Sequence, residues 1–192
     1  ELKPGAGAVA TPRCRMSATG TDLGQLETAR LTFRRIDESD ADFIFRLYST
    51  DTFKRFIADK NFQTAGDARE FIANSMMTMY RRAGMGLHLV QLKPDAIPIG
   101  ICGLIKRDSL DEVDLGFGFL PAYESRGYGY ESASSFLSFA STALALPRVV
   151  AITTSDNAAC IKLLKKLEFR FERVHEQLPE DITLGLYRRI LN

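Results

Sequence analysis

Histidine and cysteine are scarce in this sequence of 192 residues, which has only two of the first and three of the second. The cysteines, Cys14, Cys102 and Cys160, are odd in number and far apart, so they form neither a disulfide framework nor a metal-binding motif. We therefore expect a reducing compartment and no metal. Neither His88 nor His175 stands near a serine that suits a hydrolase triad. His88 lies within a strand pattern, where we expect it to be packed.

An excess of charge of one sign and a long apolar run are also missing. Lys plus Arg total 25 and Asp plus Glu total 24, which gives a formal net charge of +1. Such a balance provides no basic field for nucleic acid or an anionic membrane. No apolar run approaches the roughly 20 residues that cross a bilayer, and the first residues lack the pattern of a signal peptide. We expect a cytoplasmic protein that binds neither nucleic acid nor membrane.

The remaining composition is that of an ordinary globular protein, with 45% hydrophobic and 26% charged residues. At about 150 residues per domain, one domain is expected. Residues 1–25 are rich in Gly, Ala, Thr and Pro and lack periodicity. We expect them to be an N-terminal tail, either flexible or foreign to the native protein. A single domain over residues 26–192, monomeric or homodimeric, would follow it.

Apolar periodicity predicts a mixed sheet with helices on both faces. Alternation predicts a strand over 31–35. Ser39 is expected to cap a helix that runs to Tyr48, and Thr64 with Asp67 resembles a capping box for a second helix. Turn-rich stretches then separate three strands that antiparallel hairpins would join. These strands are expected over 87–92, 99–106 and 113–119.

The second half of the domain has a different pattern. After a strand that ends at Phe119 come a glycine-bearing loop, a helix that Pro147 ends, and a strand over 148–153, which together form a βαβ unit. We expect the sheet to splay after Phe119. Asn157 is expected to cap the next helix, and two strands over 169–174 and 182–190 complete the domain.

The loop Arg126–Tyr130 (Arg-Gly-Tyr-Gly-Tyr) is the first candidate for chemistry. Its glycines let successive backbone N–H groups point at one spot where a helix begins, which suits a phosphate. An ordinary strand-to-helix turn would use the same residues. The loop is not a Walker A motif, and Ser132 stands where a dinucleotide-binding motif requires its third glycine.

Asn157 and Cys160 are the second candidate. Their spacing places both at the start of one helix, and the βαβ unit would bring that helix beside the glycine loop. A ligand would then lie between the two. The alternative is a helix-capping Asn beside a buried Cys.

Taken together, the chain resembles the GNAT superfamily of acyl-CoA-dependent N-acetyltransferases, specifically its RimJ/RimL-like branch, which modifies protein N-termini and small amines. The resemblance extends from about Leu26 to the C-terminus. It is carried by the segments Glu27–Arg34 (ETARLTFR), Ile97–Ile105 (IPIGICGLI), Val113–Pro121 (VDLGFGFLP), Arg126–Tyr130 (RGYGY) and Asn157–Ile161 (NAACI). It implies an α/β (α+β) fold of GNAT type, with a mostly antiparallel central sheet, helices on both faces and a βαβ half that binds acyl-CoA.

The resemblance also implies roles for single residues. The loop amides would bind the coenzyme A pyrophosphate, the strand that ends at Phe119 would lend backbone groups to the pantetheine arm, and Asn157 would contact that arm. Cys160 falls where many relatives carry Ser, near the thioester sulfur. The implied binding residues for acetyl-CoA, the co-substrate, are Phe117, Phe119, Arg126, Gly127, Tyr128, Gly129, Tyr130 and Asn157.

The reaction implied is direct attack of an amine acceptor, a small molecule or a peptide N-terminus, on an acyl thioester. The protein must then position both partners, take a proton from the ammonium and help the thiolate leave. Asp114 is our candidate base, and Glu112, on the same face two residues earlier, would share or take that role. A surface carboxylate on an edge strand is the alternative for Asp114. Cys160 is the candidate acid.

Three residues depart from the family pattern. Glu131 ends the loop where Gly or Ala is usual and brings a carboxylate near the expected phosphates, unless its side chain points away. Glu168 replaces a turn glycine where a positive φ is expected. Cys160 replaces Ser. Glu131 and Cys160 leave open a GNAT-fold sensor that binds acyl-CoA without turnover, and a phosphate-binding regulatory domain is a third interpretation.

Overall fold

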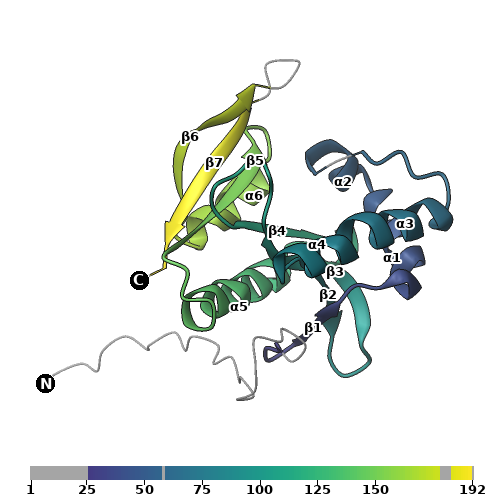
Figure 1. Ribbon diagram of the computed structural model, residues 1–192. Helices are drawn as coiled ribbons and strands as arrows, with labels where there is room; N and C mark the ends of the chain where they lie inside the picture. The colour runs from purple at the N-terminus through teal and green to yellow at the C-terminus, as the bar shows by residue number, and fades with distance from the viewer. Residues whose placement is uncertain (1–25, 58, 178–182, 192) are drawn as a thin grey trace, which may run out of the picture.

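Seven strands of the described chain form one sheet, and helices cover both of its faces (Figure 1). The structure is a computed structural model that describes residues 26–57, 59–177 and 183–191. The strands are β1 (Leu31–Arg35), β2 (Leu87–Leu92), β3 (Ile97–Ile105), β4 (Asp114–Phe119), β5 (Arg148–Thr154), β6 (Arg170–Gln177) and β7 (Thr183–Ile190). Their order in the sheet is β1-β2-β3-β4-β5-β7-β6. All neighbouring pairs are antiparallel except β4 with β5, so the predicted mixed fold is confirmed.

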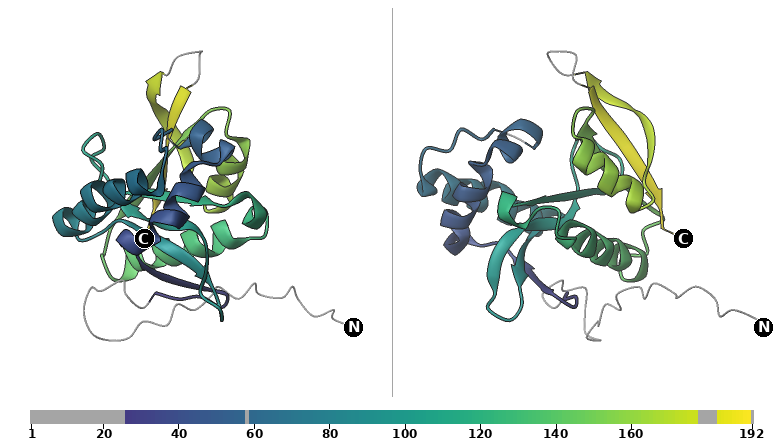
Figure 2. Two further views of the ribbon diagram at one scale, coloured as in Figure 1. Left: turned by 90° about the vertical axis from the view of Figure 1, so that its right-hand side faces the viewer. Right: turned by 180° about the vertical axis from the view of Figure 1, so that it is seen from behind.

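The helices divide between the two faces of the sheet. The main helices are α1 (Ala41–Tyr48), α2 (Asp51–Phe56), α3 (Ala65–Phe71), η3 (Ile72–Met76), α4 (Met77–Ala83), α5 (Tyr128–Thr142) and α6 (Ala158–Lys166). Helices α1 to α4 pack on one face, where Ile44, Phe53 and Ile72 meet Leu89 and Ile101 of the central strands. Helices α5 and α6 pack on the other face, and the right view of Figure 2 shows the two helical layers apart.

Local signals explain most of the element boundaries. Thr64 accepts a hydrogen bond from the backbone N–H of Asp67, and the Asp67 carboxylate accepts from Thr64 N–H in return, so the predicted capping box is confirmed. The prediction that Ser39 caps the first helix is wrong, because Asp37 caps a short 3-10 turn, η2 (Glu38–Asp40), that leads into α1. Ser39 donates to that cap with both its N–H and its hydroxyl.

Two features of the helical layer were not predicted. Helix α2 has only six residues, too few to show a period, and Thr50 caps it by accepting from Phe53 N–H. The segment η3 is a π-helical turn between α3 and α4.

Glu168 has φ 64°, as its place in the turn predicted, and its exposed carboxylate pairs with Arg189 at 2.9 Å.

The predicted tail, residues 1–25, lies outside the described residues, and so does Ile182, the first residue of the strand expected over 182–190. Within the described residues, none of the helices is long and apolar enough to cross a bilayer.

His88, which was expected to be packed, is fully buried in β2, with its ring against Phe136 and its Nδ1 3.0 Å from the carbonyl oxygen of Gly86.

Candidate active site

The parallel strands β4 and β5 meet at one point only and then separate. Asp114 at the start of β4 is in register with Val150, and the N–H of Val150 donates to the carbonyl of Val113 at 2.9 Å. In the described residues no further β4–β5 pair follows, whereas β4 stays paired with β3 along its whole length, from Asp114 to Phe119. The divergence thus begins at Asp114 rather than after Phe119, the point that the sequence had suggested.

The opening between β4 and β5 is bordered by the starts of two helices. The chain leaves β4 and enters α5 through the 126–130 loop, and it leaves β5 and enters α6 through Asn157. Because β4 and β5 are parallel, both of these connections lie at the same end of the opening. The βαβ arrangement that the sequence predicted is therefore confirmed, and it brings the two predicted groups of residues to the same end of the sheet.

Helix α5 begins without a side-chain cap. Gly127 stands at the N-cap with φ 84°, a left-handed conformation that favours glycine, and it has no side chain with which to cap the first N–H groups. These N–H groups and the positive end of the helix dipole are thus left for an anion. Arg126, which precedes them, lies with its guanidinium 5.9 Å from the ring of Tyr123.

The carboxylate of Glu131 points away from the loop amides, toward the segment that leads into β1. Its Oε1 accepts from Thr28 Oγ1 at 2.6 Å and from Arg30 N–H at 3.1 Å, and its Oε2 accepts from Arg30 Nε at 2.7 Å. Burial opposes ionisation, but these bonds outweigh it and hold the pKa of Glu131 below its ordinary value. The carboxylate of Glu131 therefore does not face the expected phosphates, and Arg30 neutralises its charge.

Asn157 and Cys160 are joined at the start of α6. The Oδ1 of Asn157 accepts from the backbone N–H of Cys160 at 3.0 Å, so Asn157 is the N-cap that the sequence predicted. Burial raises the pKa of the Cys160 thiol, although a hydrogen bond with Thr153 on β5 partly offsets it. The thiol therefore keeps its proton at neutral pH.

Asp114 is a buried carboxylate at the point where β4 and β5 separate, with only 1% of its surface exposed. Its Oδ2 accepts from Arg107 Nε at 2.6 Å, while no described residue donates to its Oδ1 with hydrogen-bond geometry. Burial raises the pKa of this carboxyl. Arg107 lowers it, and the backbone N–H of Ile152 on β5 and then His175 on β6 lower it more weakly, but together they do not cancel the rise.

The face on which Asp114 lies follows from strand alternation. Leu115 and Phe119 pack in the cluster that α5 covers, with Phe117 partly buried against it. Asp114 and Gly118 belong to the opposite face, where a Cβ atom on Gly118 would clash with the ring of Phe53 in α2. Asp114 and Cys160 thus approach the opening from opposite faces of the sheet.

Glu112, the other carboxylate proposed from sequence, is held by two arginines. Its Oε1 accepts from Arg188 Nη2 at 2.8 Å and lies 3.4 Å from Arg148 Nε. These partners come from β7 and β5 and tie the loop before β4 to the adjacent strands. Glu112 therefore has two arginine partners, whereas Asp114 has one, Arg107.

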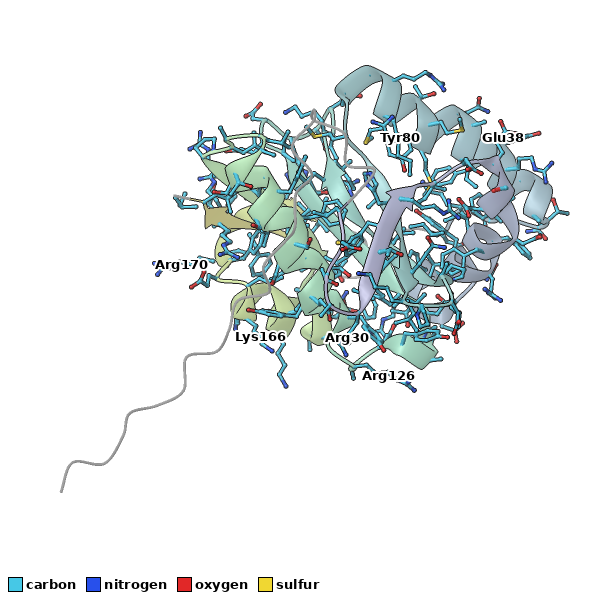
Figure 3. All side chains as sticks on the ribbon, turned by 90° about the horizontal axis from the view of Figure 1, so that it is seen from below. Arg30, Glu38, Tyr80, Arg126, Lys166 and Arg170 are labelled. Carbon is cyan, nitrogen blue, oxygen red and sulfur yellow. The ribbon has the colours of Figure 1, made fainter. Side chains whose placement is uncertain are left out.

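Cationic side chains lie over the rings of two tyrosines in the 126–130 loop. The guanidinium of Arg30 lies 4.4 Å from the centre of the Tyr128 ring, and the ammonium of Lys166 on α6 lies 4.4 Å from that of Tyr130. Figure 3 shows Arg30 and Arg126 close together, with Lys166 near them at the same end of the molecule. Three cations thus lie near the start of α5, although neither Arg30 nor Lys166 was among the site residues predicted from sequence.

The sheet opens beside the start of a helix that follows a glycine-bearing loop and has no side-chain cap. The sequence resemblance implied this architecture for an acyl-CoA-dependent transferase. Residues 30–170 match the acetyltransferase (GNAT) domain family. Since this match covers well over half of the chain, the chain belongs to the GNAT acetyltransferase family, and it is an acyl-CoA-dependent N-acetyltransferase. The family and the enzyme class predicted from sequence are confirmed.

Individual relatives agree with this assignment. The chain is 29% identical over 154 residues, 79% of its length and 86% of the relative's, to the uncharacterized N-acetyltransferase YoaA of Bacillus subtilis. Its fold matches a GNAT-family acetyltransferase from Bacillus anthracis with a TM-score of 0.72 at 20% identity, over 86% of this chain and 97% of the other. It also matches RimL, a ribosomal L7/L12 alpha-N-protein acetyltransferase in complex with coenzyme A, with a TM-score of 0.73 at 14% identity over 85% and 95% of the two chains.

Proposed function

We propose that this protein transfers the acetyl group of acetyl-CoA directly to a primary amine, either a protein N-terminus or a small molecule. The observation that carries the proposal is the separation of β4 from β5 beyond Asp114, which leaves one edge of β4 without a strand partner among the described residues. An extended pantetheine arm would lie along that edge. RimL, a fold neighbour, acts on a protein N-terminus, which supports a peptide as one class of acceptor.

The residues at the opening suit the binding of acetyl-CoA, which would supply the acyl group as an activated thioester. The uncapped start of α5 would hold the pyrophosphate through the N–H groups that follow Gly127. The backbone of β4 near Phe117 and Phe119 and the side-chain amide of Asn157 would hold the pantetheine arm. Glu131 does not oppose the phosphates, because its carboxylate is paired with Arg30.

Two side chains would then move protons. Asp114, on the face of the α1–α4 layer, would take the proton of the incoming amine at its Oδ1, the oxygen that does not bind Arg107. Cys160, on the α6 side, would give its thiol proton to the departing sulfur and regain one from solvent. The acceptor would approach from the side of α2, where Phe53 faces Gly118.

The proposal is tested by measuring thiol release from acetyl-CoA over a panel of short peptides with free N-termini, the same peptides with blocked N-termini, and small primary amines. Release is expected with at least one free amine and with none of the blocked peptides. Saturating acetyl-CoA should also raise the melting temperature, since a ligand that binds only the folded state stabilises it. Release with none of the acceptors, or an unchanged melting temperature, would contradict the proposal.

The role of Cys160 is tested by two substitutions. Cys160→Ala should lower kcat by less than about 100-fold, because coenzyme A is already a fair leaving group, with little change in acetyl-CoA affinity. Cys160→Ser should restore much of the rate, because a hydroxyl keeps a proton donor at the same place. Steady-state kinetics with acetyl-CoA varied would measure both parameters. An unaltered kcat in Cys160→Ala would show that the thiol only packs.

A further inference from the structure

The segment that leads into β1 reaches the loop at the start of α5, although the two lie about a hundred residues apart in sequence. Arg30 Nη1 donates to the carbonyl oxygen of Arg126 at 3.2 Å, and the guanidinium lies over the ring of Tyr128. A Cβ atom on Gly127 would lie 3.3 Å from Arg30 Nη2. One guanidinium therefore contacts Arg126 and Tyr128 and lies beside Gly127 between them.

Arg30 is itself held in place by Glu131. Both Nε and Nη2 of Arg30 lie 2.7 Å from Glu131 Oε2, and the backbone N–H of Arg30 donates to Oε1. Thr28 Oγ1 donates to the same oxygen and accepts from Leu31 N–H at 3.1 Å. The carboxylate thus fixes the guanidinium, its backbone and the turn before β1 together.

The opposite side of this segment is tied to the sheet. Lys93, just after β2, donates from Nζ to the carbonyl oxygen of Thr28 at 2.9 Å and pairs with Glu27 at 2.8 Å, and its backbone N–H donates to the carbonyl oxygen of Arg30. The segment is therefore anchored on both sides, and these bonds hold Arg30 in place although its side chain is 47% exposed.

We propose that the Arg30–Glu131 pair is a positioning unit that holds the 126–128 backbone in the conformation that binds the coenzyme A pyrophosphate. The inference rests on the proposed binding of acetyl-CoA at this loop. Glu131 then contributes to binding of an anion although it is an anion itself, because it orients the cation that braces the loop. Arginine suits this role because its planar fork bonds a carboxylate and a carbonyl while its face stacks on an aromatic ring.

The unit makes a prediction opposite to that of simple electrostatics. Glu131→Gln removes a negative charge beside the phosphate site and leaves Arg30 without its counter-ion, so charge alone would tighten coenzyme A binding. Loss of the brace should instead weaken it, by about 10-fold, or about 1.4 kcal/mol. Arg30→Lys keeps the charge but loses the fork and the stacking, and it should weaken binding similarly.

A matched control lies within β1, the strand that follows Arg30. Arg34 pairs with Asp40 through two hydrogen bonds, at 2.8 and 2.6 Å, with exposed side-chain fractions of 39% and 7% against 47% and 11% for Arg30 and Glu131. Asp40→Asn and Arg34→Lys should reduce stability without changing coenzyme A affinity, since this pair contacts no part of the loop.

The experiment measures the Kd of coenzyme A by calorimetry, KM and kcat for acetyl-CoA, and amide hydrogen exchange of residues 126–130 in the free protein. Glu131→Gln and Arg30→Lys should raise Kd and KM with kcat nearly unchanged, and should speed exchange in the loop. The Arg30→Ala, Glu131→Ala double variant should bind about as weakly as the weaker single variant, because the two act as one unit.

Three results would overturn the assignment, and they can be told apart. Equal or tighter binding in Glu131→Gln would show that charge alone matters. Equal effects in the Arg34 and Asp40 controls would show a general loss of stability. Absence of coenzyme A binding by the unaltered protein would overturn the proposed function together with the positioning role, even if exchange in the loop still responded.

Discussion

Asp114→Asn is expected to reduce turnover by about 10²–10⁴-fold, the usual loss for a general base, while binding of acetyl-CoA is unchanged. The amide cannot accept the amine proton, but it matches the shape of the carboxylate and can still accept a hydrogen bond from Arg107 Nε. Steady-state rates with a free-amine acceptor and calorimetry with acetyl-CoA would measure the two effects separately. Near-normal turnover would show that another group or ordered water removes the proton.

The same substitution is expected to leave folding stability unchanged or higher at neutral pH. Burial raises the pKa of Asp114 above that of the unfolded chain, so its contribution to stability is fully present below the unfolded pKa, about 3.9, and is lost as pH rises through the folded pKa. The unaltered protein should therefore lose stability over that window, and Asp114→Asn should not. A residue whose removal costs activity but not stability is typical of a functional site.

Glu112→Gln is the control for this prediction. Glu112 shares its charge between Arg188 and Arg148, so its substitution should cost stability at the contact between β5, β7 and the loop before β4, with a smaller effect on turnover. A loss of rate as large as that of Asp114→Asn, at unchanged stability, would assign the base to Glu112 instead.

The sequence predicted the strands because alternation and turn residues are local signals. The bounds of β1 and β2 agree with the prediction, since both are short strands flanked by turns or polar residues. Helix α2 was missed because six residues are too few to show a helical period. The π-helical turn η3 was missed because no residue pattern marks it.

The site was predicted only as far as short motifs extend. The glycines predicted the loop, and Asn157 predicted the start of α6, because turns and helix caps depend on residues that are close in sequence. Arg30 and Glu131, which pair with each other, are 101 residues apart in sequence, and Glu112 and Arg188 are 76 residues apart. Such contacts arise from sheet topology, so a single sequence shows the residues without showing that they meet.

The two glycines of the 126–130 loop have different structural roles, which the sequence alone did not distinguish. A Cβ atom on Gly129 would lie 3.0 Å from Leu163 Cδ2 and 3.6 Å from the ring of Phe119. Gly129 therefore allows α5 to approach α6 closely. Gly127 instead has the left-handed conformation, with φ 84°, that starts the helix without a side-chain cap. The loop backbone thus depends on Gly127 above all.

Gly127→Val is expected to reduce acetyl-CoA affinity by roughly 100-fold or more, about 2.7 kcal/mol. A β-branched residue strongly disfavours this backbone conformation, and its Cβ would lie 3.3 Å from Nη2 of Arg30, a tight contact with the guanidinium that braces the loop. Gly84→Val is the matched control, because Gly84 ends α4 with φ 68° and has open space around it. Both variants should lose roughly 1–2 kcal/mol of stability through the left-handed conformation, but only Gly127→Val should lose the ligand.

Thermal shift with acetyl-CoA at 100 times the Kd of the unaltered protein measures this difference directly. The ligand should stabilise the unaltered protein and Gly84→Val by about 2.7 kcal/mol, and Gly127→Val by only about 0.4 kcal/mol if its Kd is 100-fold higher. Because each shift is taken between the free and bound forms of one variant, the common loss of stability cancels. A full shift in Gly127→Val would show that acetyl-CoA does not depend on the start of α5, and the pyrophosphate would have to be placed elsewhere.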